Sequence, residues 1–384
     1  MTPMEVAPEI LRWAVERSGK EPTTLARRFP KLNAWLTRDS APTFKQLEDF
    51  AAATYTPFGY FFLPAPPEEP LPIPDFRTRR AEALRKPSGD LLDTIYLCQQ
   101  RQAWFEEFAR EEGLDPVRLV GSLTRATPVT EAAQAIREAL GFDLEQRRQD
   151  RTWAEALRRM IQAVEDAGIL IMVSGIVGSN THRKLDPEEF RGFALAHSHA
   201  PLLFVNGADS KSAQMFTIAH ELAHLALGES ALSDAEASVF PDEQTERWCN
   251  QVAAEVLVPL AVLQQELQAA EPVAAATARL ARRFKVSSLV ILRRMLEARW
   301  IRTWDEFQTA YAREVERVKE VTTEAAGGGD FYRTLGVRVS RRFEYAVVAD
   351  TLNGRTAYRE AMRLLGFKRV ATFDKLANEL GFQR

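Results

Sequence analysis

Apolar residues recur at helical spacing through most of the 384-residue chain. Over residues 4–64 this spacing predicts several short helices joined by tight connections. The prolines between Pro57 and Pro74 then disfavour helix and sheet ladders and predict a semi-rigid extended linker. Helical spacing resumes over residues 91–165. The pattern therefore predicts a small helical domain, a linker and a longer, mainly helical region.

A different pattern interrupts this longer region. Residues 169–173 form a short apolar run that is rich in β-branched side chains and lies between glycines, which predicts a strand. Residues 190–195 and 201–206 predict two more strands. Either Asp209 or Ser210 can cap the helix that follows, and this helix is expected to end at Gly228. We therefore expect a small sheet followed by a capped helix.

The capped helix contains the pattern H-E-x-x-H, as His220, Glu221 and His224. The sequence has only five histidines, and two of them lie here, four residues apart. On a helix, positions i and i+4 project from the same face, so both imidazoles can bind one zinc ion. Glu221 is then the candidate general base.

A catalytic zinc ion requires a third protein ligand and an open position for water. A second helix is predicted from Pro241 to Val258, on which Glu246 and Asn250 share one face by i, i+4 spacing. A carboxylate from a following helix completes a His-His-Glu set, and Glu246 is our choice. Glu243 and Glu255 are the rival carboxylates. Glu243 falls in the fraying first turn, whereas Glu255 falls on a different face.

These two segments resemble a known family. Residues 216–224, F-T-I-A-H-E-L-A-H, and the downstream run E-x-x-C-N-x-x-A-A-E-x-L-V-P from Glu246 to Pro259 are similar to motifs of the ImmA/IrrE zinc metallopeptidases. The resemblance covers roughly residues 130–265 well. It implies that the zinc ligands are His220, His224 and Glu246 and that Glu221 is the catalytic acid/base. Cys249 replaces the usual alanine, and Val252 replaces a usual aromatic residue. Neither position is a zinc ligand or the catalytic acid/base.

Other reactive side chains have simpler interpretations. Cys98 and Cys249 are far apart in the sequence, which excludes a disulfide framework or a cysteine-rich zinc module. Cys249 is interpreted as a buried structural thiol. His197 and His199, in the turn between two predicted strands, are candidates to stabilise an oxyanion, although a role as plain loop residues is the simpler interpretation.

Two segments resemble helix-turn-helix motifs. Residues 4–64 are loosely similar to the repressor-like (XRE-type) domain, and their candidate DNA-groove helix, around residues 30–36, offers little more than Lys31, Asn33 and Arg38 to read bases. A protein partner, or packing on the next domain, is an equally good interpretation. The second segment pairs predicted helices at 275–284 and 287–297 and carries the basic residues Arg282, Arg283, Lys285, Arg293 and Arg294. It could contact DNA, dock the cleaved regulator, or serve as helical support.

The C-terminal end is expected to be mainly helical. A long helix over residues 304–321 leads to a glycine run at 327–329, which is a flexible break and not a phosphate loop. Residues 337–348 predict a strand followed by a helix, and residues 358–365 and 373–380 predict closing helices.

Composition agrees with a soluble protein, at 46% hydrophobic and 27% charged residues. No apolar run approaches the roughly 20 residues of a membrane helix, and no signal pattern opens the chain, so we expect a cytoplasmic protein. Residues 1–64 carry 8 basic and 7 acidic side chains, residues 65–270 carry 20 and 32, and residues 271–384 carry 22 and 14. The basic C-terminal third could contact nucleic acid or an acidic partner, but solvated helix faces produce the same count.

Together these observations predict an α+β, mostly helical protein with a zincin-like metallopeptidase core. The expected domains are a repressor-like domain (1–64), a proline-rich linker (65–80), the peptidase domain (81–268) and a mainly helical region (269–384). The expected function is that of a cytoplasmic Zn²⁺-dependent endopeptidase. The family resemblance implies a specific protein substrate, a repressor or antitoxin, in stress response, mobile-element or toxin–antitoxin control. The alternative is a non-proteolytic regulator or antitoxin that uses the same fold to bind a partner protein, a cognate toxin or DNA.

Overall fold

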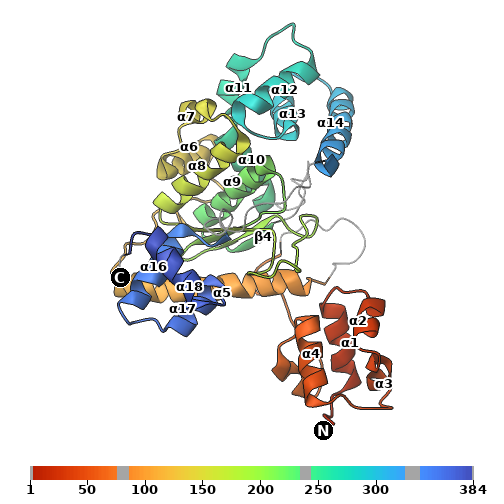
Figure 1. Cartoon of the computed structure of the whole chain (residues 1–384). Coiled ribbons are helices and arrows are strands. Elements are labelled where there is room, and N and C mark those ends of the chain that lie inside the picture. The colour runs from red at the N-terminus through yellow and green to blue at the C-terminus, as the bar shows by residue number, and fades with distance from the viewer. Residues whose placement is uncertain (1–2, 76–85, 234–243, 325–337, 383–384) are drawn as a thin grey trace. The chain divides into compact units, whose positions relative to one another are not determined.

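The computed structural model describes residues 3–75, 86–233, 244–324 and 338–382, with the backbone alone for residues 318–324 (Figure 1). The chain divides into two compact units. The first unit comprises Met1–Pro72 and Ala81–Tyr96, and the second comprises Ile73–Arg80 and Leu97–Arg384. Both units are mostly helical, and the second holds one small mixed sheet, in agreement with the expected α+β class. The domain boundaries at 64, 80 and 268 stay predictions.

The first unit is built from short helices around an aromatic core. Phe50 lies at its centre, with its ring centroid 5.3 Å from that of Phe29 and 6.0 Å from that of Trp35. Thr43 and Gln46 form a capping box that begins α4. The elements are α1 (Pro8–Arg17), α2 (Pro22–Arg28), α3 (Leu32–Leu36), α4 (Phe44–Thr54) and a 3-10 helix, η1 (Phe58–Phe62). The proline-rich stretch predicted from Pro57 therefore begins with a helical turn that the sequence analysis missed.

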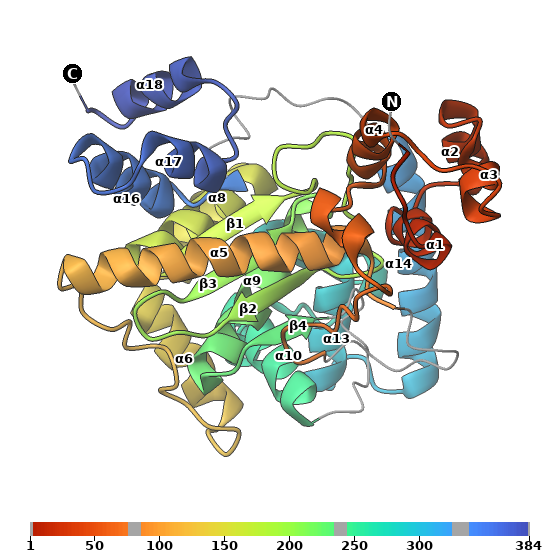
Figure 2. The same cartoon turned by 90° about the horizontal axis from the view of Figure 1, so that it is seen from below.

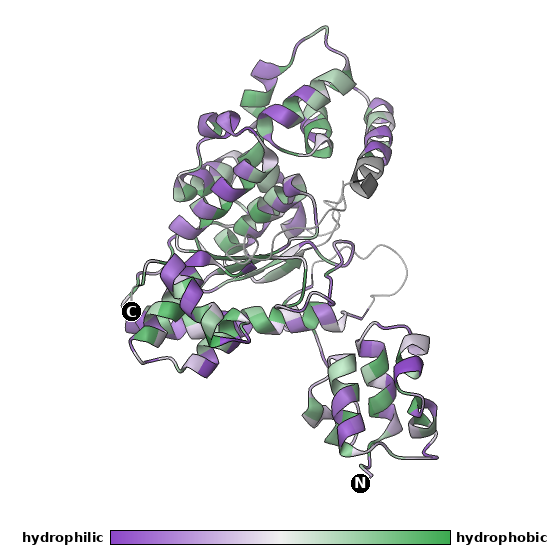
Figure 3. Cartoon of the chain, in the orientation of Figure 1, coloured by the Kyte–Doolittle hydropathy of each residue, from purple (hydrophilic) through white to green (hydrophobic). Residues whose placement is uncertain are grey.

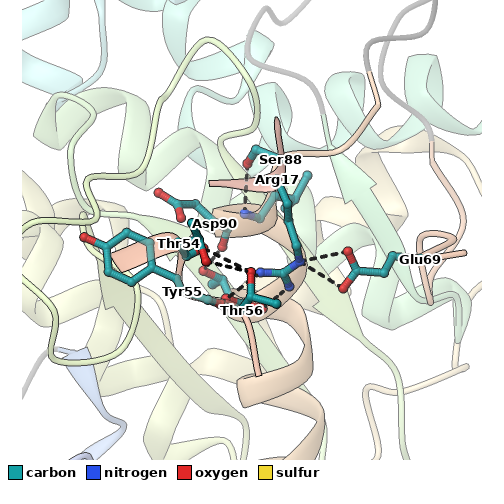
Figure 4. A network of polar contacts seen from close by, with 10 residues as sticks. Arg17, Thr54, Tyr55, Thr56, Glu69, Ser88 and Asp90 are labelled. Carbon is teal, nitrogen blue, oxygen red and sulfur yellow. Dashed lines mark hydrogen bonds and ion pairs between the residues drawn. The ribbon is translucent and has the colours of Figure 1, made fainter. Parts of the chain in front are cut away.

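A buried arginine ties distant segments of the first unit together (Figure 4). The Nε atom of Arg17 donates to both carboxylate oxygens of Glu69, at 2.8 and 3.1 Å, and Nη2 donates to Asp93 at 2.6 Å. Nη1 donates to the backbone oxygen of Tyr55 at 3.2 Å. Burial alone would lower the pKa of Arg17, but these hydrogen bonds and carboxylate charges raise it. Arg17 thus holds Glu69, from the proline-rich stretch, and the start of α5 (Gly89–Glu111) on the helical core.

The second unit contains the sheet and the remaining helices. Its strands are β1 (Leu170–Ser174), β2 (Gly192–Leu195), β3 (Leu202–Asn206) and β4 (Ala231–Ser233). Besides α5 from Leu97 onward, its helices before the C-terminal end are α6 (Val129–Leu140), α7 (Leu144–Gln149), α8 (Trp153–Asp166), α9 (Lys211–Leu227), α10 (Gln244–Leu257), α11 (Leu260–Glu266), α12 (Val273–Phe284), α13 (Ser288–Glu297) and α14 (Trp304–Glu324). The last three helices are α16 (Arg341–Leu352), α17 (Tyr358–Leu365) and α18 (Val370–Glu379).

The sheet has the strand order β1-β3-β2-β4. β1 pairs with β3 in parallel, whereas β2 is antiparallel to both β3 and β4. β1, β2 and β3 confirm the three predicted strands, and every one of their residues is buried. β4 was missed because three residues carry too little periodicity to predict a strand.

Helices cover both faces of this sheet. Figures 1 and 2 show α5 across one face and α8, α9 and α10 on the other. Helices that face solvent carry hydrophilic residues on one side and hydrophobic residues on the other (Figure 3). By contrast, α9 is buried almost all round from Gln214 to Ala226. The helix with H-E-x-x-H is therefore a central core element.

The C-terminal helices dock on α5 and α8 by polar contacts. Arg101 of α5 donates to the backbone oxygen of Leu364 at 2.9 Å, and Ser340 donates to Glu165 of α8 at 2.6 Å. The expected strand before α16 is wrong for the described residues: none of residues 338–340 belongs to a strand, and the helix begins at Arg341. The apolar residues there follow the helical period, because they face the core from one side of α16. The predicted glycine break at 327–329 lies outside the described residues.

Within the described ranges, no helix is both long enough and apolar enough to cross a bilayer.

Candidate metal centre

The two histidines of the motif lie in the middle of α9. Ser210 caps this helix by accepting a 3.2 Å hydrogen bond from the backbone N–H of Ala213, and Gly228 ends it in the left-handed conformation (φ 74°). Both helix limits were predicted. Because α9 is buried on nearly all sides, packing restricts the rotamers of its side chains. His220 and His224 project from one face, with their ring centroids 4.9 Å apart.

The carboxylate of Glu246 meets both histidines from α10. Its Oε2 atom lies 3.2 Å from Nε2 of His220, and its Oε1 atom lies 2.9 Å from Nε2 of His224. The two Nε2 atoms are 3.1 Å apart. Only 5% of His220 and 5% of Glu246 is exposed, and His224 is fully buried. Two helices that are separate in sequence thus bring three metal-ligand groups to one point.

This triad has the dimensions of a tetrahedral metal site. With metal–ligand bonds of about 2.0–2.1 Å, neighbouring ligand atoms of a tetrahedral zinc site lie ~3.3–3.4 Å apart. The three separations, 3.1, 2.9 and 3.2 Å, fall just short of that edge length. Among the described residues, this triad is the one group of three or more such side chains whose ligand atoms all converge within 4.8 Å. The donor set therefore fits a bound metal ion.

The charges of the triad are strongly coupled. Burial by itself lowers the pKa of His220, but the charge and hydrogen bond of Glu246 raise it to about 9. Burial likewise raises the pKa of Glu246, but the charge of His220 and hydrogen bonds from both histidines lower it to about 2. The pKa of His224 is lowered, first by burial. A metal ion must therefore displace a proton from His220, because the neutral imidazole is the ligand.

A second residue of α10 orients His220. The Nδ1 atom of His220 donates to Oδ1 of Asn250 at 3.0 Å. Asn250 follows Glu246 by one helical turn, so one face of α10 provides both the carboxylate and this acceptor. A proton on Nδ1 leaves the lone pair of Nε2 directed at the triad, which is the tautomer a metal ligand needs. The sequence analysis noted the shared face of Glu246 and Asn250 without assigning a role to Asn250.

Glu221 lies beside the triad and against the backbone of β2. A Cβ atom at Gly192 would lie 3.3 Å from Oε1 of Glu221, 2.5 Å from Cγ2 of Thr217 and 2.7 Å from the backbone oxygen of Phe204. Only glycine leaves room at this position for the fully buried carboxyl of Glu221. The sequence analysis assigned no role to Gly192, although its place at the start of a strand could have suggested a close approach of the backbone.

Glu255, one of the two rival carboxylates, has partners outside the triad. Glu255 forms an ion pair with Arg294 and accepts from the backbone N–H of Leu260. Glu243 lies outside the described residues. Cys249 is a buried free thiol, as predicted, and burial holds its pKa well above the usual value.

His197 and His199 follow the end of β2 and have partners outside the triad. Nε2 of His197 is 3.3 Å from Glu106, and Nδ1 of His199 is 3.0 Å from the backbone oxygen of Leu114. Gly192 starts β2, and the strand runs ~10 Å from there to Leu195, before either histidine is reached. These contacts favour the interpretation of both histidines as loop residues.

Comparison with known proteins agrees with this geometry. Residues 164–296 match the family model of the IrrE N-terminal-like domain of peptidases, and residues 339–379 match a domain of unknown function, DUF8813. The first match supports the ImmA/IrrE resemblance. The same match supports a metallopeptidase-like function for this part of the chain. The matched region starts later than the resemblance quoted above and continues through α12 and α13. No match is found among curated proteins.

The second helix-turn-helix-like segment is packed into the second unit. α12 and α13 are joined by a short turn in which Lys285 is left-handed (φ 53°). However, α13 has no exposed residue before Glu297, and it packs against α11, α12 and α14. Several basic side chains are also paired, Arg283 with Glu266 and Arg293 with Glu297. In this packing α13 is not presented to a DNA groove, which favours its interpretation as helical support.

Proposed function

We propose that this protein is a zinc-dependent endopeptidase that cleaves a specific regulatory protein, with His220, His224 and Glu246 as the metal ligands. The observation that carries the proposal is the convergence of both Nε2 atoms and the Glu246 carboxylate within 3.2 Å of one another. The donor set of two imidazoles and one carboxylate is the one that zinc peptidases use. It lies inside the region that matches the peptidase family model.

In this proposal each side chain has a separate task. His220, His224 and Glu246 would hold the zinc ion, which would supply Lewis-acid chemistry and lower the pKa of water at this point. Glu221 accepts the proton of the attacking water and delivers it to the leaving amine. Its fixed position beside Gly192 keeps the carboxyl close to the triad without making it a ligand. Asn250 holds His220 in the tautomer that presents Nε2.

The substrate class follows from the family resemblance. Resemblance to the ImmA/IrrE family implies that the protein that is cut is a repressor-like regulator or an antitoxin. The competing hypothesis is a non-proteolytic regulator or antitoxin, which binds its partner through the same fold. Both hypotheses share the metal site, so metal binding alone does not separate them.

The deciding experiment compares three variants of the full chain. The purified protein should hold about one zinc ion, and His220→Ala should lose it, whereas His182→Ala, at an exposed histidine outside the triad, should keep it. Glu221→Gln should retain zinc and lose cleavage of the regulator encoded beside the gene. Stoichiometric zinc in His220→Ala would refute the ligand assignment. A biological effect that survives Glu221→Gln would favour the binding hypothesis.

DNA contact by the first unit is a second, separate candidate. Around α2 and α3 the side chains of Arg27, Arg28, Lys31 and Arg38 are all exposed, as is Asn33, in contrast to the buried α13. If this face binds phosphates, affinity for duplex DNA should fall steeply with salt, and Arg28→Ala and Lys31→Ala should each reduce the salt slope by about one. Binding that does not depend on salt would contradict this candidate.

A further inference from the structure

The outer edge of β4 is already occupied by a segment of the chain itself. β4 is the last strand of the order β1-β3-β2-β4, and residue Asp75 forms an isolated parallel bridge with Leu232 on its far side. The backbone N–H of Leu232 donates to the oxygen of Pro74 at 3.1 Å. Ile73 is 6% exposed, whereas Pro72 and Pro74 are exposed. Residues 73–75 therefore lie on the sheet as a short added strand.

The way residues 73–75 pair with β4 resembles the binding of a peptide by addition of a strand to a sheet edge. In that mode the backbone pairs with a sheet edge, and alternate side chains enter the protein. Ile73 supplies the buried side chain. Pro72 and Pro74 have no N–H, so neither can donate to a ladder. Ile73 therefore gives the segment a buried apolar anchor, and Pro72 and Pro74 limit the backbone bonds that it can add to the edge of β4.

The occupied edge lies close to the candidate metal centre. Leu232 is paired with Phe193, and Ser233 is paired with Gly192, where an added Cβ atom would lie 3.3 Å from Oε1 of Glu221. A strand on the outer side of β4 is two strand spacings, about 10 Å, from β2. Two or three extended residues span that distance, at ~3.3 Å each. A peptide docked on this edge can therefore extend to Glu221 within a few residues of its docked part.

We propose that the outer edge of β4 is a docking site for an extended peptide segment of the protein substrate, and that residues 73–75 occupy it as an internal competitor. The peptide it fits has an apolar residue at the position of Ile73 and an extended backbone on both sides. This proposal rests on the proposed endopeptidase function for the identity of the peptide as substrate, but not for the binding itself. Displacement of residues 73–75 then accompanies substrate binding.

A binding experiment on the full-length chain tests the proposal without requiring turnover. Ile73→Ala removes the anchor and should release the edge, so hydrogen exchange at the Leu232 amide should become at least ~10-fold faster than in the wild type. A labelled peptide with the sequence Pro-Leu-Pro-Ile-Pro-Asp, that of residues 70–75, should bind Ile73→Ala at least ~10-fold more tightly than the wild type and restore slow exchange. The same peptide with aspartate in place of isoleucine should not bind.

Controls separate local release from general damage. Pro72→Ala changes an exposed neighbour and should behave as the wild type. Ile73→Thr keeps the β-branched shape and replaces Ile73→Ala if that variant fails to fold, as judged by zinc content and melting temperature. Equal peptide binding to wild type and variant, or unchanged Leu232 exchange in a folded variant, would overturn the proposal.

A second readout keeps this proposal distinct from the proposed function. If the protein cleaves its regulator, the unlabelled peptide should slow cleavage by Ile73→Ala, and absence of any slowing would count against the docking site. If no variant cleaves any protein but the peptide binds Ile73→Ala as described, the docking site stands and the endopeptidase function fails.

Discussion

The Nδ1 atom of His220 donates a 3.0 Å hydrogen bond to Oδ1 of Asn250, which follows Glu246 by one turn of α10. The same helix therefore supplies a carboxylate to one side of the triad and an acceptor that orients an imidazole on the other. Because both groups lie on α10, any shift of this helix relative to α9 changes the ligand distance and the ligand orientation together.

Asn250→Ala should weaken zinc binding by about 10–100-fold, because His220 loses the acceptor that fixes its tautomer. Asn250→Asp retains an acceptor and should bind zinc at least as tightly as the wild type. Competition with a chelator of known affinity measures both. Cys249→Ala, at the neighbouring buried thiol, is the matched control and should leave zinc affinity unchanged. Unaltered zinc affinity in Asn250→Ala would show that the hydrogen bond does not orient the ligand.

Gly192→Ala should destabilise the second unit by about 1–3 kcal/mol, because the new methyl group overlaps Thr217 and the backbone of Phe204. It should also lower cleavage by displacing Glu221, while zinc content stays near the wild-type value. Gly59→Ala is the control, since a Cβ atom there meets nothing within 4 Å. Thermal unfolding and zinc analysis give the two measurements. A Gly192→Ala protein with wild-type stability would contradict the close packing of β2 against α9.

Arg17→Met should destabilise the first unit by about 3 kcal/mol, because Glu69 and Asp93 are left without their shared cation in a largely buried setting. Arg17→Lys keeps the charge but cannot form the paired hydrogen bonds, so its loss should be intermediate. Arg27→Met, on an exposed face, is the control. Hydrogen exchange in α1 and α4 reports on this unit alone. Equal protection in Arg17→Met and Arg27→Met would mean that the network contributes little.

The stability of the second unit should fall as the pH rises from about 5 to about 8, because of Glu344 on α16. Glu344 is 2% exposed, and burial, with the charge of Glu165, raises its pKa to about 8. The folded state thus binds this proton more tightly than the unfolded state. The stabilisation is complete below the unfolded pKa of about 4.3 and is lost as the pH rises through the folded pKa.

Glu344→Gln should remove the part of this pH dependence that Glu344 contributes and make the protein more stable than the wild type at pH 8; the raised pKa of His220 contributes separately. Glu360→Gln, on the exposed side of α17, should leave the pH dependence unchanged. Melting temperatures of the three proteins between pH 5 and pH 8.5 test the prediction. Parallel pH profiles for wild type and Glu344→Gln would refute it.

Local patterns predicted much of the site. α9 was predicted with its limits, because Ser210 and Gly228 act through local hydrogen bonding and backbone conformation. The i, i+4 spacing of His220 and His224 follows from helix geometry alone. Three strands were likewise predicted from short apolar runs. Each of these features depends on residues that are close in sequence.

Several features had no such local signal. β4 is a strand only because its backbone pairs with β2, and α16 begins where a strand was expected because its apolar residues face a core formed by other helices. α13 has the basic residues of a DNA-contacting segment, but α11 and α14 cover it. Strand pairing and the burial of a helix by its neighbours depend on elements that are distant in sequence. The spacing of apolar residues along one segment carries no information about those elements.

The sequence by itself determined that one helix carries two histidines four residues apart, with a glutamate directly after the first, and that a second helix carries a carboxylate suited to complete the set. Only the tertiary structure decided that Glu246, and not Glu255, meets those histidines, since the packing of α10 on α9 selects which face of α10 is turned inward. It also decided that Gly192 and Asn250 position Glu221 and His220, and that residues 73–75 lie on the edge of β4. Such contacts join segments far apart in sequence, and the packed core alone brings them within reach.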